Sequence, residues 1–203
     1  FNFTGDISGY AMADFMLAHG FPAPLVHVIP YGIEVGEAPA ARVSSGPLVA
    51  GVHFRHPAAL VKAATTLDVL AGPGRTYLGL GAGWYEREAR GLGFPFPPRA
   101  ERFDRLEETL RIAGAMFAGD RTPIVGTHYE LAEPINVPAP LTKPRPRIMV
   151  GGNGRRRTMG LVAMYGDACN ILNPDPGESR RLVDEIRRRC DEIGRDAGEV
   201  ETT

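Results

Sequence analysis

Cysteine is scarce in this sequence, and the two cysteines present lie far apart. Cys169 and Cys190 form no Cys-x-x-Cys pair and no cluster with histidine. Zinc sites and disulfide frameworks depend on such spacings, so the sequence predicts neither a metal site nor a disulfide-stabilised domain. Because free thiols persist in reducing compartments, we expect a cytoplasmic protein.

Long apolar runs and an excess of charge of one sign are absent as well, and we expect no leader segment. No run approaches the roughly 18 consecutive apolar residues of a membrane span, and no basic stretch precedes an apolar one near the start. The formal net charge is only −1, which gives no reason to expect nucleic acid or a membrane surface as a partner. With 203 residues, 43% of them hydrophobic, the chain can bury a single core. We therefore expect one globular domain that acts on a small molecule.

The ends of the chain differ from its middle. It begins with Phe1 rather than Met and stops at Thr203, and we expect it to be incomplete at both ends. Turn formers recur through residues 1–45 without a regular period, so only the short apolar run 25–29 is predicted as a strand there.

From residue 46 onward, short apolar runs alternate with longer amphipathic segments. We predict four strands, each followed by a helix: strands 47–52, 76–81, 147–150 and 167–172, and helices 57–71, 100–118, 155–165 and 178–193. Residues 119–144 hold many turn formers and are predicted to be an insertion between a helix and the next strand. The alternation predicts an α/β fold with a parallel sheet. Periodicity alone leaves an open doubly wound sheet and a closed barrel as alternatives, and in both a ligand lies at the carboxyl ends of the strands.

The spacing of apolar residues predicts which face of each helix is buried. In the first helix these are Leu60, Ala63 or Ala64, Leu67 and Leu70; in the second, Phe103, Leu106, Leu110, Ala113 and Phe117; in the last, Leu182, Ile186, Cys190 and Ile193, with Gly194 ending that helix. The second helix is predicted to keep Arg102, Arg105, Glu108 and Arg111 in water.

Two predicted strands end in glycine-rich turns. The first is Gly79-Leu80-Gly81-Ala82-Gly83-Trp84, where missing side chains either let the backbone approach a flat ligand or pack strand tightly against helix. The second, Gly151-Gly152-Asn153-Gly154-Arg155, lies just before a helix. Free N–H groups and the helix dipole make that turn a candidate phosphate site, and Arg155 to Arg157 add positive charge. The alternative is a flexible turn with solvated arginines.

Other candidate residues have two interpretations each. Trp84 either walls a flavin-type ring or packs in the fold, and His53 points either into the mouth of the sheet or outward. We interpret His56, beside Pro57, as a helix cap, the acidic residues Glu86 and Glu88 as partners of a helix dipole, and Arg187 to Arg189 as a solvated helix face. No Ser/His/Asp set, HExxH or Walker A string is present.

Several segments resemble luciferase-like monooxygenases in order and spacing. They are 46–57, 68–75, 78–84, 101–108, 146–154, 165–170 and 194–196, within a match over about residues 42–203. The resemblance is closest to the subgroup of deazaflavin (coenzyme F420)-dependent oxidoreductases. It implies a partial (β/α)8 TIM barrel with an insertion before the fifth strand, and it covers residues 1–41 poorly.

The resemblance also implies a cofactor site. The flavin-type ring is expected over the strand ends at Val49, Ala50, Gly83 and Trp84, and the phosphate on Gly151 to Gly154. Members of the family often carry a non-prolyl cis peptide near residues 47–50. They usually carry an Asp-His pair after the second strand as well, of which Ala13-Asp14-Phe15 is only a faint echo. Some relatives that oxidise sugar phosphates place a Glu where this chain has Trp84.

The resemblance predicts an oxidoreductase that transfers hydride between F420 and a small organic substrate. The acidic lactyl-glutamyl tail of F420 would suit the basic residues near the phosphate turn. One alternative is an FMN-dependent monooxygenase. Another is a non-catalytic flavin-binding module or a fragment without activity. An unclosed barrel exposes unpaired strand edges, and members of the family often dimerise, so a homodimer is the expected partner.

Overall fold

The structure is a computed structural model that describes residues 2–3, 27–28, 45–172 and 175–203. Near the start of the chain, β1 (Asn2–Phe3) pairs in parallel with β2 (His27–Val28). Strand β2 falls within the run 25–29 predicted to be a strand. The echo of an Asp-His pair at Ala13-Asp14-Phe15 lies outside the described residues.

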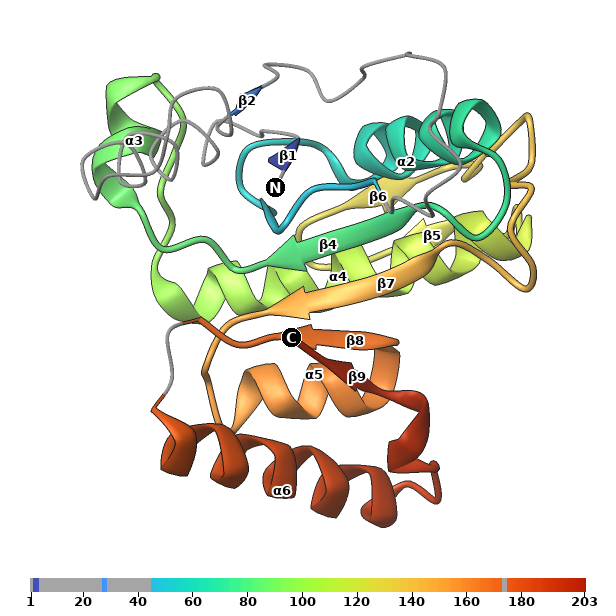
Figure 1. The fold of residues 1–203 in the computed structure, drawn as a ribbon. Coiled ribbons are helices and arrows are strands. Elements are labelled where there is room, and N and C mark those ends of the chain that lie inside the picture. The colour runs from blue at the N-terminus through green and yellow to red at the C-terminus, as the bar shows by residue number, and fades with distance from the viewer. Residues whose placement is uncertain (1, 4–26, 29–44, 173–174) are drawn as a thin grey trace.

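The main sheet has five parallel strands whose order in space is their order in the chain (Figure 1). They are β3 (Ala50–Gly51), β4 (Tyr77–Gly81), β7 (Arg147–Gly151), β8 (Ala168–Asn170) and β9 (Glu201–Thr202). A doubly wound sheet reverses its strand order at a switch point, whereas a barrel adds each strand on the same side of the last. The described strands show no reversal, so the sheet is wound in one direction, as in a (β/α)8 barrel.

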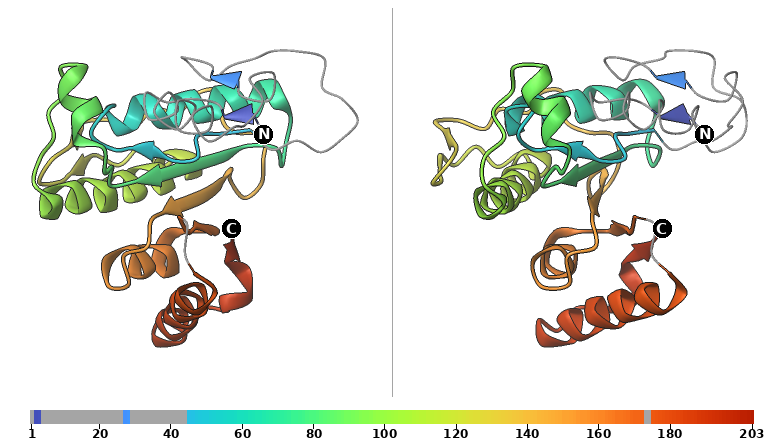
Figure 2. Two further views of the ribbon diagram at one scale, coloured as in Figure 1. Left: turned by 60° about the vertical axis from the view of Figure 1, so that its left-hand side comes forward. Right: turned by 90° about the vertical axis from the view of Figure 1, so that its left-hand side faces the viewer.

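The helices form one layer along this sheet. The long ones are α2 (Pro57–Ala71), α4 (Arg99–Ala118), α5 (Arg157–Tyr165) and α6 (Pro176–Glu192), with the short α3 (Glu86–Gly91) and the 3-10 helix η2 (Ala197–Glu199) between elements. Each long helix packs on the next, as Figures 1 and 2 show. The core lies between helices and strands, where the buried strand residues are Ala50, Leu78, Leu80, Ile148, Val150 and Cys169.

Helix boundaries follow their sequence signals. His56 caps α2, because its Nδ1 accepts a hydrogen bond from the N–H of Ala58 at 3.3 Å. This confirms the interpretation of His56 as a cap. At the end of α6, Gly194 adopts a φ of +69°, the left-handed conformation that commonly ends helices.

Some predictions of buried and exposed faces are wrong. Leu70 and Ile193, predicted to be buried, are each 53% exposed. Arg102 and Glu108, predicted to face water, are only 9% exposed. The cause is packing between segments that lie far apart in the sequence. Loops cover parts of α2 and α4 that the helical period alone assigns to solvent.

The insertion 119–144 is the main cover of this kind. It contains a small antiparallel hairpin, β5 (Ile124–Val125) and β6 (Glu130–Leu131), and no helix. Its later part is bound along one face of α2, at positions spaced by three. Lys62 Nζ donates to the carbonyl of Val137 (3.3 Å), Thr65 Oγ1 accepts from Asn136 (3.0 Å), and Asp68 accepts from the N–H of Thr142 (2.9 Å). We call this contact the strap.

Glu108 of α4 holds the turn of the hairpin. Its carboxylate accepts hydrogen bonds from three consecutive backbone N–H groups, those of Thr127 (2.8 Å), His128 (3.0 Å) and Tyr129 (3.1 Å). A Cβ on Gly126 would lie 2.4 Å from the Glu108 carboxylate, so glycine is required for this approach. The buried charge is therefore satisfied by the backbone of the insertion.

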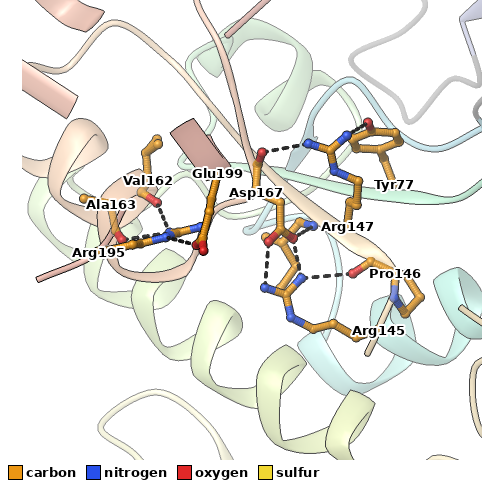
Figure 3. A network of polar contacts seen from close by, with 10 residues as sticks. Tyr77, Arg145, Pro146, Arg147, Val162, Ala163, Asp167, Arg195 and Glu199 are labelled. Carbon is orange, nitrogen blue, oxygen red and sulfur yellow. Dashed lines mark hydrogen bonds and ion pairs between the residues drawn. The ribbon is translucent and has the colours of Figure 1, made fainter. Parts of the chain in front are cut away.

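Side chains join the amino ends of the strands (Figure 3). Asp167, just before β8, forms a two-point ion pair with Arg145 and accepts from the N–H of Ile148 at 2.7 Å. Its carbonyl accepts from Arg147 (3.0 Å) and from the N–H of Glu201 (3.1 Å). Asp167, which leads into β8, thus contacts residues at the amino ends of β7 and β9, and we call this set of contacts the amino-end network.

Candidate functional site

The carboxyl ends of the strands are lined by glycine around one aliphatic side chain. A Cβ built on Gly81 would lie 2.9 Å from Val49, and one built on Gly151 would lie 2.6 Å from the same side chain. Gly51 pairs with Gly81 across β3 and β4. Val49 therefore lies over a surface of bare backbone on the side of the sheet away from the helices.

The segment that carries Val49 is not a regular strand. Of the predicted strand 47–52, only residues 50–51 have strand geometry, and the peptide bond between Leu48 and Val49 is cis. A Cβ on Gly79 would lie only 2.0 Å from the carbonyl oxygen of Pro47. The non-prolyl cis peptide implied by the family resemblance is thus present at the implied place.

His53 lies on the next turn, over Gly83. Gly83 has a φ of +77°, and a Cβ on it would lie 2.2 Å from the His53 ring. The imidazole packs 4.1 Å from the ring of Phe54 and edge-on to Phe96 at 5.2 Å. His53 therefore faces the mouth formed by β3 and β4, which answers the question that the sequence left open.

The other residues predicted to lie near the flavin-type ring differ in their burial. Trp84 is 67% exposed, with its ring 5.1 Å from that of Tyr85, so it stands at the rim and is not part of the core. Ala82 is partly buried against the core. Ala50 is fully buried in the helix-facing core and pairs with Leu80. The side chain of Ala50 consequently points away from Val49, and only its backbone faces the candidate site.

The turn after β7 presents backbone donors. Gly152 has a φ of +126°, a conformation that L side chains rarely adopt, and its N–H is taken by the carbonyl of Asn170 at 2.9 Å. Within the described part of the chain, the N–H groups of Asn153, Gly154 and Arg155 have no acceptor. They precede the first turn of α5, where the helix dipole favours an anion.

Side chains fix the shape of this turn. The amide of Asn153 donates to the carbonyl of Leu172 (2.7 Å) and accepts from the N–H of Leu172 (2.8 Å), which ties the turn to the end of β8. Thr158 is buried, and its Oγ1 would lie 2.6 Å from a Cβ on Gly154. Arg155 is exposed beside them. The turn can therefore offer several N–H groups and a hydroxyl to one phosphate.

Sequence reasoning did not single out Thr158. The available signal was a hydroxyl residue in the first turn of a helix that follows a glycine-rich turn, a position where the side chain folds back on the turn. The carboxylates Glu86 and Glu88 lie in the first turn of α3, as expected for partners of its dipole.

Other kinds of chemistry find less support in the described residues. Among them, no three His, Cys, Asp or Glu side chains gather closely enough to hold a metal ion. Burial raises the pKa of the Cys169 thiol to about 12, so it is not a nucleophile at neutral pH. No described helix is long and apolar enough to cross a membrane.

The one-directional order of the parallel strands and their helices places this chain in the class of TIM-barrel folds. The family model of luciferase-like monooxygenases matches residues 40–203, and the chain belongs to this family. An F420-dependent glucose-6-phosphate dehydrogenase of Beutenbergia cavernae is 36% identical over 142 residues, which are 60% of this chain and 42% of the relative. An FMNH2-dependent dimethylsulfone monooxygenase of Pseudomonas putida is 32% identical over 99 residues, 49% of this chain and 27% of that protein.

Solved structures show the same fold. EDTA monooxygenase from Chelativorans sp. BNC1 matches with a TM-score of 0.70 at 19% identity, over 97% of this chain and 56% of that chain. An F420-dependent secondary alcohol dehydrogenase matches with a TM-score of 0.69 at 18% identity, over 97% of this chain and 62% of the other. The (β/α)8 barrel predicted from the resemblance is confirmed. The chain spans less than half the length of the first curated relatives it matches.

Proposed function

We propose that this chain forms the cofactor-binding part of an oxidoreductase that transfers hydride between coenzyme F420 and a small organic substrate. The observation that carries the proposal is the pairing of two features at one end of the sheet: a glycine-lined surface around Val49 and a donor-rich turn at Gly152 to Arg155. Relatives at 30–36% identity named as F420-dependent dehydrogenases support the choice of cofactor.

The residues present fit a flavin-type ring and its phosphate. Glycine at positions 83 and 151 lets the His53 ring and the Val49 side chain lie directly against the backbone at the strand ends, because an added Cβ would collide with them. In the proposal the turn after β7 binds the phosphate through its N–H groups and Thr158. Val49 supports one face of the ring, and Trp84 bounds the rim on which a substrate enters.

A bound deazaflavin would supply a ring carbon that accepts or donates hydride. The chain itself would orient the cofactor and limit the access of water, for which the apolar groups Val49, Phe54 and Phe96 are suited. In this proposal the substrate is not a sugar phosphate, because the family resemblance implies a Glu at the position of Trp84 in some relatives that oxidise sugar phosphates.

Direct titration tests the proposal. The purified chain is titrated with F420 and with FMN while cofactor fluorescence is followed, and the same is done with Gly152→Asp. We expect micromolar binding of F420 that the variant loses, because Asp adds a negative charge and a Cβ at a φ of +126°. Circular dichroism and thermal melting of the variant separate lost binding from lost folding.

The alternative function is that of an FMN-dependent monooxygenase, which the similarity to the dimethylsulfone enzyme favours. Tight binding of FMN with weak binding of F420 in the same titration would select it. If neither cofactor binds to folded protein, the proposal of a cofactor-binding part is wrong, and the alternative of a fragment without activity stands.

A further inference from the structure

Arginines from three elements surround two adjoining hollows beside the phosphate turn. The first hollow, of about 470 Å³, is lined by Arg99, Ala100, Phe103, Gly154, Arg155, Arg156 and Arg157. The second, of about 420 Å³, is lined by Arg155, Arg156, Glu185, Arg188 and Arg189. Because both share Arg155 and Arg156, we treat them as one feature, the arginine hollow. Each volume lies within the roughly 300–1,000 Å³ of ligand pockets.

Acidic side chains neutralise only part of this charge. Arg157 pairs with Asp104 at 2.5 Å, Arg188 and Arg189 share Glu185, and Arg188 also pairs with Glu192. In the described part of the chain, Arg99, Arg155 and Arg156 have no ion-pair partner. A concave surface with several uncompensated like charges concentrates anions. The hollow is therefore suited to a ligand with several negative charges.

The hollow continues directly from the phosphate turn. Gly154 belongs to both, and Arg155 is the next residue. Helices α4 and α5 begin at the side of the sheet where β4 and β7 end (Figure 1). The ring of Phe103 lies 5.7 Å from the Arg99 guanidinium and 5.1 Å from that of Arg157, an apolar wall beside which both cations are held. A chain attached to a phosphate on the turn thus reaches arginines from more than one element.

We propose that the arginine hollow binds the carboxylates of the lactyl-glutamyl tail of F420. The inference rests on the proposed function and extends it to a part of the cofactor remote from the reacting ring. Spaced single charges match arginines distributed over two hollows, whereas one compact phosphate needs only the turn. FMN ends at its phosphate and has no group for the hollow.

The test varies the tail and the arginines separately. The binding of F420 without glutamates and of F420 with several glutamates is compared for the wild-type chain, for Arg99→Gln/Arg156→Gln, and for the control Arg187→Gln. Arg187 is an exposed arginine of the same helix as Arg188, and it does not line the hollow. Titrations are made at low salt and at about 0.5 M salt, where charges at the surface are screened.

We expect the wild-type chain to bind the long-tailed form about fivefold more tightly at low salt, as a few exposed charge pairs allow. The double variant should lose that preference and still bind the form without glutamates, which also shows that it folds. The control should keep the preference, and high salt should abolish it.

Two outcomes overturn the inference in distinguishable ways. If the wild-type chain binds both forms equally, the hollow does not recognise the tail, while the proposed function survives. If no form of F420 binds to the folded chain, the proposed function fails and takes the inference with it. Comparing the binding of the two forms of F420 to the wild-type chain tests the inference even if a variant does not fold.

Discussion

At the amino ends of the strands, side chains bind the segments to one another, whereas at the carboxyl ends the backbone is left bare. The amino-end network joins Asp167 to Arg145, Arg147 and the backbone of neighbouring strands. The carboxyl ends instead present Gly81 and Gly151. The same five strands thus have one end joined by polar side chains and another built from glycines that lie against Val49.

The difference separates two requirements of a barrel enzyme. Contacts at the amino ends contribute to stability, while ligands bind at the carboxyl ends. Glycine has no side chain with which to form stabilising contacts, so these contacts must lie elsewhere. The comparison predicts that changes at one end affect mainly the free energy of unfolding, and changes at the other mainly affect binding.

The largest effect is expected for Asp167→Ala. The change leaves Arg145 without its two-point partner and removes the acceptor of the Ile148 N–H. We expect a loss of about 3 kcal/mol in the free energy of unfolding, because a partly buried charged partner is removed. Urea unfolding measures it, and F420 affinity should stay unchanged. The control Asp184→Ala removes an exposed ion pair and should shift stability by less than about 0.5 kcal/mol. Equal losses in both variants would contradict a special role for the amino end.

An intermediate effect is expected for Gly83→Ala at the opposite end. The new Cβ would meet the His53 ring at 2.2 Å, and the φ of +77° disfavours alanine. We expect F420 affinity to fall about tenfold, or about 1.4 kcal/mol. In a His53→Ala background the same change should cost less, since its obstacle is gone, and a double-mutant cycle measures that coupling. Additive costs would show that His53 does not determine the space above Gly83.

The smallest effect is expected for the ion pairs between Glu185, Arg188 and Arg189 on α6, which border the arginine hollow. Hydrogen bonds from Arg188 and Arg189 lower the pKa of Glu185 to about 2, so the folded state favours its ionised form. The stability gained is present above the ordinary carboxylate pKa near 4.5 and is lost as the pH falls toward about 2. Glu185→Gln should therefore lower the melting temperature slightly at pH 7, corresponding to less than about 1 kcal/mol, because water screens the pair. The gap between the two proteins should close between pH 4.5 and 2, and a gap that stayed constant would contradict this cause.

Local patterns in the sequence predicted much of the fold. The stripe Phe103, Leu106 and Leu110 is buried as expected, and Gly194 ends α6. The sheet and its parallel strands followed from the alternation of short and long segments. Closure into a barrel did not follow from periodicity, because both closures give the same local pattern; the family resemblance supplied it.

What the sequence did not predict depends on contacts between distant segments. Glu108 was assigned to water by its position on α4, yet three N–H groups of the insertion surround it. Thr65 and Asp68 are buried on α2 for the same reason. His53 and Thr158 lie at the candidate site, and only their neighbours in space show how they face it. The cofactor residues themselves stay predictions until binding is measured.

The strap has a consequence for the order in which this chain assembles. A long connection separates β4 from β7, and closing a long loop costs conformational entropy. Once Asn136 and Thr142 are bonded to α2, only a short piece of chain remains free before Arg147, so the register of β7 is nearly decided before it meets β4. Helix α2 therefore acts as a template for β7, although residues 72–146 separate the two elements in the chain. A folding experiment that monitors α2 and β7 separately should find that the helix becomes protected first.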